Sequence, residues 1–167
     1  MTIRTHISTQ GTTLTEATVA AFVAILILGA LFTINLSSMK SIRTAREATS
    51  ASQILQQRVE AMRIANWQQV TNADWVKNNL LNSNANGSEG LNSMSETLTL
   101  SPYGTNGGTM QLVRSGGATQ IVSQNADLLK EMAMKVVWTV AYNGGMNGRT
   151  TTRQAVAVLA KGGVAKW

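Results

Sequence analysis

The sequence predicts an α+β protein in which a long N-terminal helix, apolar enough in its first half to span a membrane, packs against a small C-terminal antiparallel β-sheet. Three observations predict this fold. An uncharged apolar run fills residues 17–39, helix-forming residues without Gly or Pro continue from Lys40 to about Asn66, and the apolar period changes to two after residue 96. Because the chain has only 167 residues, it can build one modest domain beside such an anchor.

Composition excludes several functional classes. Charged residues make up 13% of the chain, against roughly a quarter in ordinary soluble domains, and the deficit lies in the apolar run. The net charge is +6, but no nucleic-acid-binding motif is present, so nucleic acid stays a secondary hypothesis at the level of an assembled filament. Five basic residues predict a solvated basic face on the helix: Lys40, Arg43, Arg46, Arg58 and Arg63. The absence of cysteine excludes disulfides, thiol catalysis and thiolate metal sites.

The apolar run can be read in three ways. Residues 17–34 would form a helix of about 27 Å, and the uncharged stretch to Met39 one of about 34 Å, which crosses a hydrocarbon core of about 30 Å. A secretory signal peptide has a shorter core and no acidic residue such as Glu16 at its start. A plain signal anchor fits the length but leaves the junction at residues 11–16 unexplained.

That junction, Gly-Thr-Thr-Leu-Thr-Glu at residues 11–16, resembles the processing site of type IV prepilins and type II secretion pseudopilins, where the usual pattern is Gly-Phe-Thr-Leu-Ile-Glu. Thr12 stands in the place of the Phe and Thr15 in that of an aliphatic residue. The resemblance implies a leader peptide, residues 1–11, that a prepilin peptidase cleaves after Gly11. Thr12 then becomes the N-terminus and the candidate for N-methylation. The helix-kinking proline of major pilins would fall at Thr33, so a straighter helix is expected.

The resemblance also gives roles to the residues of the helix. Glu16 would pair with the α-amino group of a neighbouring subunit, whereas from the residue alone a simple helix-start role, next to the positive end of the dipole, is an equal alternative. Residues 12–39 would lie first in membrane lipid and later in a filament core with other pilin or pseudopilin subunits, delivered by an inner-membrane assembly platform. The packing residues would be Val19, Phe22, Ile25, Leu28, Leu31 and Leu36.

The orientation in the membrane has two opposing signals. Arg4 is the sole Lys or Arg before the apolar run, whereas Lys40, Arg43 and Arg46 follow it, so the positive-inside rule places the C-terminal part in the cytoplasm. The resemblance implies the reverse, and the cleavage junction is the more specific signal. We therefore expect a single-pass protein of the bacterial inner membrane with its C-terminal domain outside the cytoplasm, later part of a periplasmic or cell-surface filament.

Residues 40–67 are expected to be the soluble half of the same helix. Ala48, Ala51, Leu55, Val59 and Met62 recur at spacings of three and four and predict one apolar stripe facing a core. The segment 51–63 resembles PilV-like minor pilins and I-type pseudopilins, with small residues, an aliphatic pair and Glu-x-x-Arg. Glu60 and Arg63 within it predict a surface ion pair worth at most about 0.5 kcal/mol.

Residues 68–167 are expected to form a β-rich head. An Asn-, Gly- and Ser-rich stretch at about 78–92 predicts a solvated loop. The period of two then predicts five strands, with a turn at residues 115–117 and a wide hairpin loop at 143–148. These strands are residues 97–100, 109–113, 119–122, 134–142 and 154–160.

No catalytic or metal-binding motif emerges, so we expect no enzyme, cofactor or metal. The single histidine, His6, lies in the expected leader, and the Gly pairs fall where turns are expected. The sequence thus favours a structural filament subunit and leaves pilus, secretion and DNA-uptake systems open, because they share these features. The alternative is a monomeric single-pass membrane-anchored protein whose exported β-domain binds a ligand.

Overall fold

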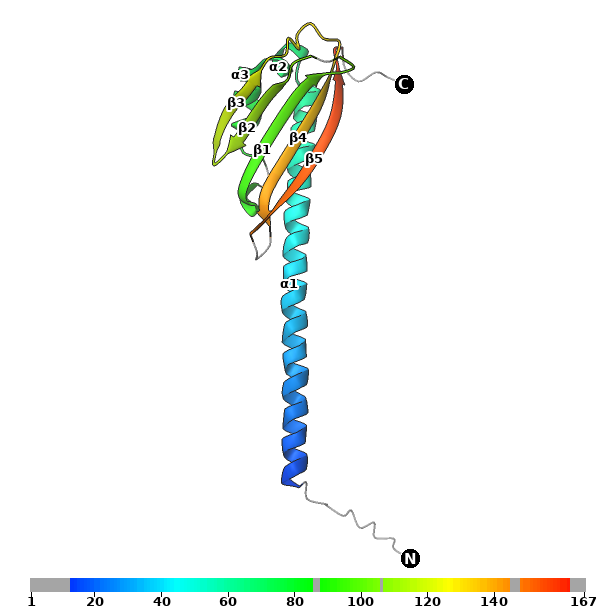
Figure 1. The fold of residues 1–167 in the computed structure, drawn as a ribbon, viewed down its shortest axis with the longest axis vertical. Helices are drawn as coiled ribbons and strands as arrows, with labels where there is room; N and C mark the ends of the chain where they lie inside the picture. Colours follow the sequence, from blue (N-terminus) through cyan, green and yellow to red (C-terminus); the bar gives the residue numbers. More distant parts are fainter. Residues whose placement is uncertain (1–12, 86–87, 106, 145–147, 163–167) are drawn as a thin grey trace, which may run out of the picture. The chain divides into compact units, whose positions relative to one another are not determined.

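The computed structural model describes residues 13–85, 88–105, 107–144 and 148–162 and confirms the α+β class (Figure 1). The chain divides into two units, residues 1–41 and 42–167, and helix α1 belongs to both. The helical elements are α1 (Leu14–Ile64), α2 (Trp67–Val70), α3 (Ala73–Val76), the π-helix η1 (Lys77–Leu81) and the 3₁₀ helix η2 (Ser88–Gly90). The strands are β1 (Asn92–Pro102), β2 (Met110–Ser115), β3 (Ala118–Gln124), β4 (Ala133–Gly144) and β5 (Arg149–Ala160).

In the first unit, α1 is a helix with every described side chain exposed. Of the helices in the described residues, α1 alone is long and apolar enough to span a membrane. Two of its hydroxyl groups donate to carbonyls of the same helix, Thr18 Oγ1 to Leu14 at 3.1 Å and Thr33 Oγ1 to Gly29 at 2.7 Å. Such internal bonds let a helix carry hydroxyls through lipid without leaving polar groups unpaired.

After Ile64 the chain turns through two capped helices. The Asn66 side chain accepts from the Gln68 amide, and the Gln69 side chain accepts from the Asn66 amide at 2.9 Å, which together form a capping box for α2. Asn72 caps α3 by accepting from the amides of Asp74 and Trp75 at 2.9 and 3.1 Å. The helix therefore ends within two residues of the expected Asn66, where a new cap begins.

The expectation of a solvated loop at about 78–92 is wrong in its first part. Lys77–Leu81 forms η1, and Leu80 and Leu81 are buried in the core. Ala85 and Leu91 are buried as well. The many Asn and Ser residues around these positions favoured the prediction of a loop. The four buried apolar residues nevertheless hold the segment in the core.

All five expected strands are present, and each is longer than the alternation predicted. They form one antiparallel sheet in the order β3-β2-β1-β4-β5. The expected turn between β2 and β3 is confirmed at Gly116 and Gly117, whose φ angles of 58° and 83° are in the region that favours glycine. Residues 145–147 of the expected 143–148 loop lie outside the described residues.

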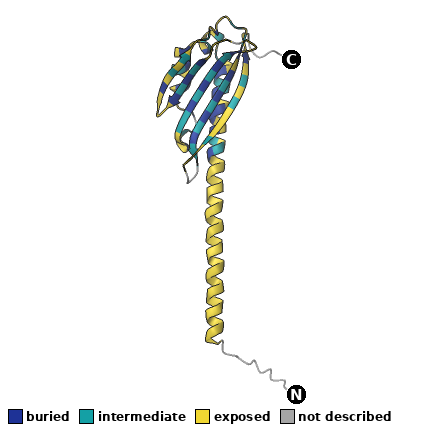
Figure 2. Ribbon diagram, viewed as in Figure 1, coloured by how far each residue is buried: buried dark blue, intermediate teal, exposed yellow. Residues whose placement is uncertain are grey.

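The core of the second unit lies between α1 and one face of this sheet (Figure 2). From the predicted stripe on α1, Ala51, Leu55 and Met62 are buried, whereas Ala48 and Val59 are half-buried and Ile54 joins the buried set. The sheet contributes alternate residues that share its inner face: Leu98, Leu100, Leu112, Met134, Val136, Trp138 and Val140. The alternate residues of the strands and the residues spaced three and four apart on α1 thus pack in the same core.

We predict that Leu98→Ala lowers the free energy of unfolding by about 2–5 kcal/mol, because it opens a cavity at the centre of this core. Leu98 is fully buried and is paired with Leu112 on one side and Trp138 on the other. Urea unfolding followed by circular dichroism measures the change. Thr152→Ala, on the exposed side of β5, is the control, and an equal loss in both variants would contradict the placement of the core.

Candidate functional site

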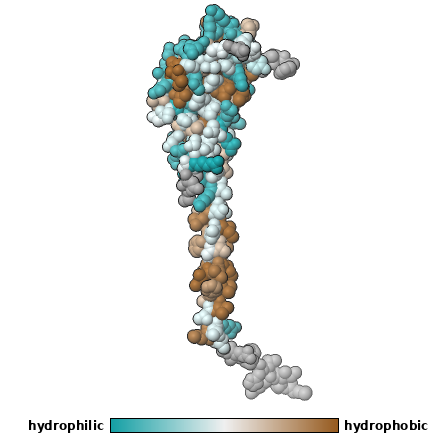
Figure 3. Space-filling model, in the orientation of Figure 1, coloured by the Kyte–Doolittle hydropathy of each residue, from teal (hydrophilic) through white to brown (hydrophobic). Residues whose placement is uncertain are grey.

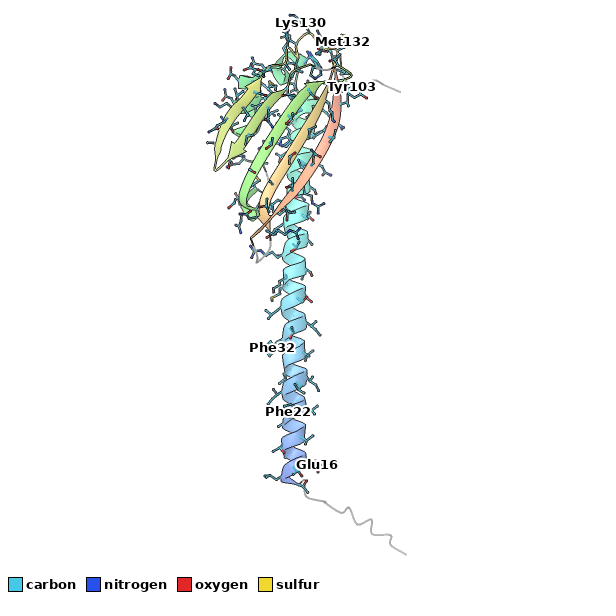
Figure 4. All side chains as sticks on the ribbon, in the orientation of Figure 1. Glu16, Phe22, Phe32, Tyr103, Lys130 and Met132 are labelled. Carbon is cyan, nitrogen blue, oxygen red and sulfur yellow. The ribbon has the colours of Figure 1, made fainter. Side chains whose placement is uncertain are left out.

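The predicted packing residues of α1 lie on a helix surface that no described residue covers. Figure 3 shows apolar side chains around this part of α1. The six predicted side chains are 52–67% exposed: Val19, Phe22, Ile25, Leu28, Leu31 and Leu36. Phe22 and Phe32 project from α1 as labelled in Figure 4. A soluble monomer rarely leaves so large an apolar surface open to water, so lipid or protein must cover it.

Glu16 lies in the first turn of this apolar helix (Figure 4). Its amide donates to the Thr13 carbonyl at 3.0 Å, which makes Glu16 part of the first turn of the helix. There the positive end of the helix dipole favours a negative charge. Gly11 and Thr12, predicted as the cleavage site, lie outside the described residues.

The second unit holds a buried ionic cluster that joins α1 to the sheet. We call Arg58, Glu96 and Arg114 the Arg–Glu–Arg cluster. Arg58 meets the Glu96 carboxylate through two nitrogens, with Nε to Oε2 at 2.9 Å and Nη2 to Oε1 at 3.0 Å. Arg114 Nη1 donates to Oε1 of the same carboxylate at 3.0 Å. The Glu96 side chain is fully buried, so both pairs are shielded from water.

The remaining donors of the cluster reach η1 and the chain that follows it. Arg58 Nη1 donates to the Leu80 carbonyl, and Arg58 Nη2 donates to the Ser83 carbonyl at 2.8 Å. Arg114 Nη2 donates to Asn84 Oδ1 at 2.7 Å. With two guanidinium groups and one carboxylate, the cluster has an excess positive charge, which these oxygen acceptors offset.

The Arg58 side chain also lies over the ring of buried Trp138, with 5.9 Å between the guanidinium carbon and the ring centroid. The cluster therefore joins four segments: α1, β1, β2 and residues 80–84 at and after the end of η1. Guanidinium and carboxylate groups held by this many partners tie the segments of the head together.

The expectation that Arg58 belongs to a solvated basic face is wrong, because only 3% of the residue is exposed. A signal was present, since Arg58 lies four residues after Ile54 and four before Met62, within the buried stripe. Likewise Glu96 stands two residues before Leu98 on the inner face of β1. By contrast, the expected surface pair of Glu60 and Arg63 is confirmed, with 3.7 Å between the charged atoms.

A groove of about 820 Å³ runs between α1 and β5 on the second unit. Gln53, Val59, Glu60 and Arg63 line it from the helix, and Arg153 and Val156 from the strand. Amide and charged side chains surround a partly apolar floor. Among the described residues, no group of His, Cys, Asp or Glu side chains could hold a metal ion.

We predict that Glu96→Gln lowers the free energy of unfolding by about 3–5 kcal/mol, because it leaves two buried guanidinium groups without a countercharge. Glu60→Gln is the matched control. Its carboxylate pairs with Arg63 on the surface, so the change should stay within about 0.5 kcal/mol. Thermal and urea unfolding of both variants measure the difference. Similar stabilities would contradict the importance of the cluster.

Comparison with known protein families, with curated proteins and with solved structures found no match.

Proposed function

We propose that this chain is a structural subunit, a minor pilin or pseudopilin, of a type IV pilus or type II secretion filament. The observation that carries the proposal is the apolar surface of α1, which is exposed on every side in the described residues 14–39. The second unit has a complete core of its own and does not need that surface for its folding. Such a surface suits a segment that lies in lipid first and against other helices later.

The two environments of the helix have nearly the same polarity. Lipid tails are as apolar as Leu side chains, so transfer from lipid to a bundle of neighbouring helices depends on packing and on the few polar groups. Large and branched side chains such as Phe22, Ile25 and Leu28 provide the packing surface on α1. The subunit would thus leave the inner membrane and enter the filament without exposing the helix to water.

Glu16 supplies the specific interaction in this proposal. A carboxylate at the edge of a membrane span is costly without a partner. Cleavage after Gly11 by a prepilin peptidase creates an α-amino group on Thr12, which carries a positive charge at neutral pH. Pairing of that group with Glu16 of a neighbour removes both charges from an apolar surrounding and fixes the axial position of the incoming subunit. The assembly platform of the inner membrane would present the subunits to one another.

A second candidate function has one observation in its favour. The groove between α1 and β5 has a volume that fits a ligand or peptide, which would suit a monomeric membrane-anchored binding protein. In that case the N-terminal junction has no role and the leader stays attached. The two functions therefore differ at the first residue of the mature chain.

We predict that the chain extracted from membranes of cells with an active prepilin peptidase begins at Thr12. Intact-mass spectrometry and N-terminal sequencing measure the cleavage and also show whether Thr12 carries a methyl group. The matched control is Gly11→Trp, which blocks the cut by its bulk and should leave Met1 in place. A wild-type chain that keeps Met1 would favour the membrane-anchored binding protein.

We predict that Glu16→Ala is cleaved normally but enters filaments at less than about a tenth of the wild-type level, since losing one buried charge pair of about 1.4 kcal/mol or more is a tenfold effect. Shear fractionation followed by immunoblotting measures incorporation. Glu89→Ala, in the exposed 3₁₀ helix η2 of the head, is the control and should assemble as wild type. Normal incorporation of Glu16→Ala would contradict the pairing.

A further inference from the structure

We propose that the β5 edge of the head receives the β3 edge of a second copy of this chain, so that neighbouring heads share one continuous sheet. The inference rests on the proposed function in one respect, that neighbouring chains have the same orientation. The two edges belong to the same sheet, whose order is β3-β2-β1-β4-β5. A second copy of the chain can therefore place its β3 edge beside the β5 edge of the first copy.

Both edges are open, and each contains a stretch without Pro or charged residues. In the described residues, the outer sides of β3 and β5 have no neighbouring strand. Natural proteins usually protect such edges with Pro or charged side chains. Arg149 and Arg153 lie in the first half of β5, but residues 118–124 of β3 and 154–158 of β5 contain neither Pro nor charge. These two uncharged windows leave backbone donors and acceptors available to another strand.

The exposed apolar side chains of the sheet lie on these same two strands. Val122 of β3 is 58% exposed, and Val156 and Val158 of β5 are 58% and 49% exposed. Among the described residues of the central strands β1, β2 and β4, large apolar side chains are buried or half-buried. The sheet is thus apolar at its two edges, where a joint between copies would cover it.

The strand directions fit copies that point the same way. Four successive antiparallel steps separate β3 from β5, so these two strands run parallel to each other. A parallel joint between β5 of one copy and β3 of the next keeps residues 42–64 of both helices in the same direction. An antiparallel joint would reverse one helix, which a shared membrane or filament does not allow.

The register within the sheet identifies which residues would meet. Gln120, Val113, Thr97, Thr139 and Gln154 form one row across the five strands. If the next copy continues the sheet without an axial shift, its Gln120 lies beside Gln154. An axial shift of two residues brings Gln120 beside a neighbouring outer-face position of β5.

The groove beside β5 would receive the elements under the β3 edge of the second copy. Arg58 Nη1 donates to the Leu80 carbonyl, so η1 lies beside α1 on the inner face of the sheet. The adjoining α3 carries the exposed Asp74, which lines a small pocket with Gln124 at the end of β3. The groove carries Arg63 and Arg153 against a single acidic residue, Glu60. Asp74 of the second copy therefore has the complementary charge.

A joint of this kind uses two different surfaces of each copy. Such a heterologous contact does not close after two subunits but repeats, and it produces a ring or an open helical array. This is the symmetry of a filament, and the joint would add contacts between heads to those between apolar helices.

Cysteine cross-linking in the full-length, membrane-embedded protein tests the joint, because the chain has no cysteine of its own. Gln120→Cys is combined with Gln154→Cys, and in separate variants with Thr152→Cys or Val156→Cys to allow for an axial shift. After mild oxidation, we expect a ladder of disulfide-linked multimers from at least one combination, at least tenfold above Gln120→Cys with Thr139→Cys. Thr139 is the control because it lies in the same row but on central strand β4.

Three outcomes would overturn the inference: no ladder in any combination, an equal ladder with Thr139→Cys, or dimers from Gln120→Cys alone. Charge reversal gives a second measure. Asp74→Arg should weaken the ladder severalfold, and adding Arg63→Asp should restore it. N-terminal sequencing of the same variants separates the two proposals. Chains that begin at Thr12 without a ladder refute only the joint, and a ladder from chains that keep Met1 refutes only the filament processing.

Discussion

One buried carboxylate, that of Glu96, is the interaction on which the head depends. It accepts from Arg58 on α1 and from Arg114 on β2, while it lies itself on β1. Burying an ion costs several kcal/mol unless its partners are in place, so the cluster is favourable in a single arrangement of these elements. A slip of β1 by one residue would turn Glu96 to the outer face and leave two guanidinium groups unpaired in the core. The cluster thus fixes the register of the sheet as well as its position on α1.

The rest of the head follows from this constraint. Arg58 and Arg114 use their remaining donors on the Ser83 carbonyl and on Asn84, so the segment after η1 is held although it is rich in turn-forming residues. The preceding helix α3 lies beside the end of β3, where Asp74 and Gln124 line the same pocket. The groove, the exposed valines and the open edges belong to the same arrangement, in which no described strand pairs with the outer sides of β3 and β5.

Much of this fold could be predicted from local sequence patterns. The absence of charge over residues 17–39 and the alternation in residues 134–142 depend on neighbours in the sequence, so the helix and the strongest strand were evident. The burial of Arg58 could not be predicted from such patterns. A basic residue in a helical stripe is buried only when carboxylate and carbonyl groups from distant segments surround it. The π-helix at Lys77–Leu81 was missed for the same reason: its two buried leucines are anchored by tertiary contacts. For the candidate site, Glu16 could be placed at the helix start from its position alone, whereas the groove requires the full topology.

The length of the apolar part of α1 affects the energy of the chain in a bilayer. The uncharged stretch from Ala17 to Met39 measures about 34 Å as a helix, a few ångströms more than a hydrocarbon core of about 30 Å. Such hydrophobic mismatch tilts the helix or deforms the lipid, at a fraction of a kcal/mol for each ångström. In the proposed function, a chain with this helix would be held in the membrane under a small elastic load. Transfer into a filament, which has no fixed thickness, would release that load, so the bilayer itself would contribute to the force that drives the subunit out.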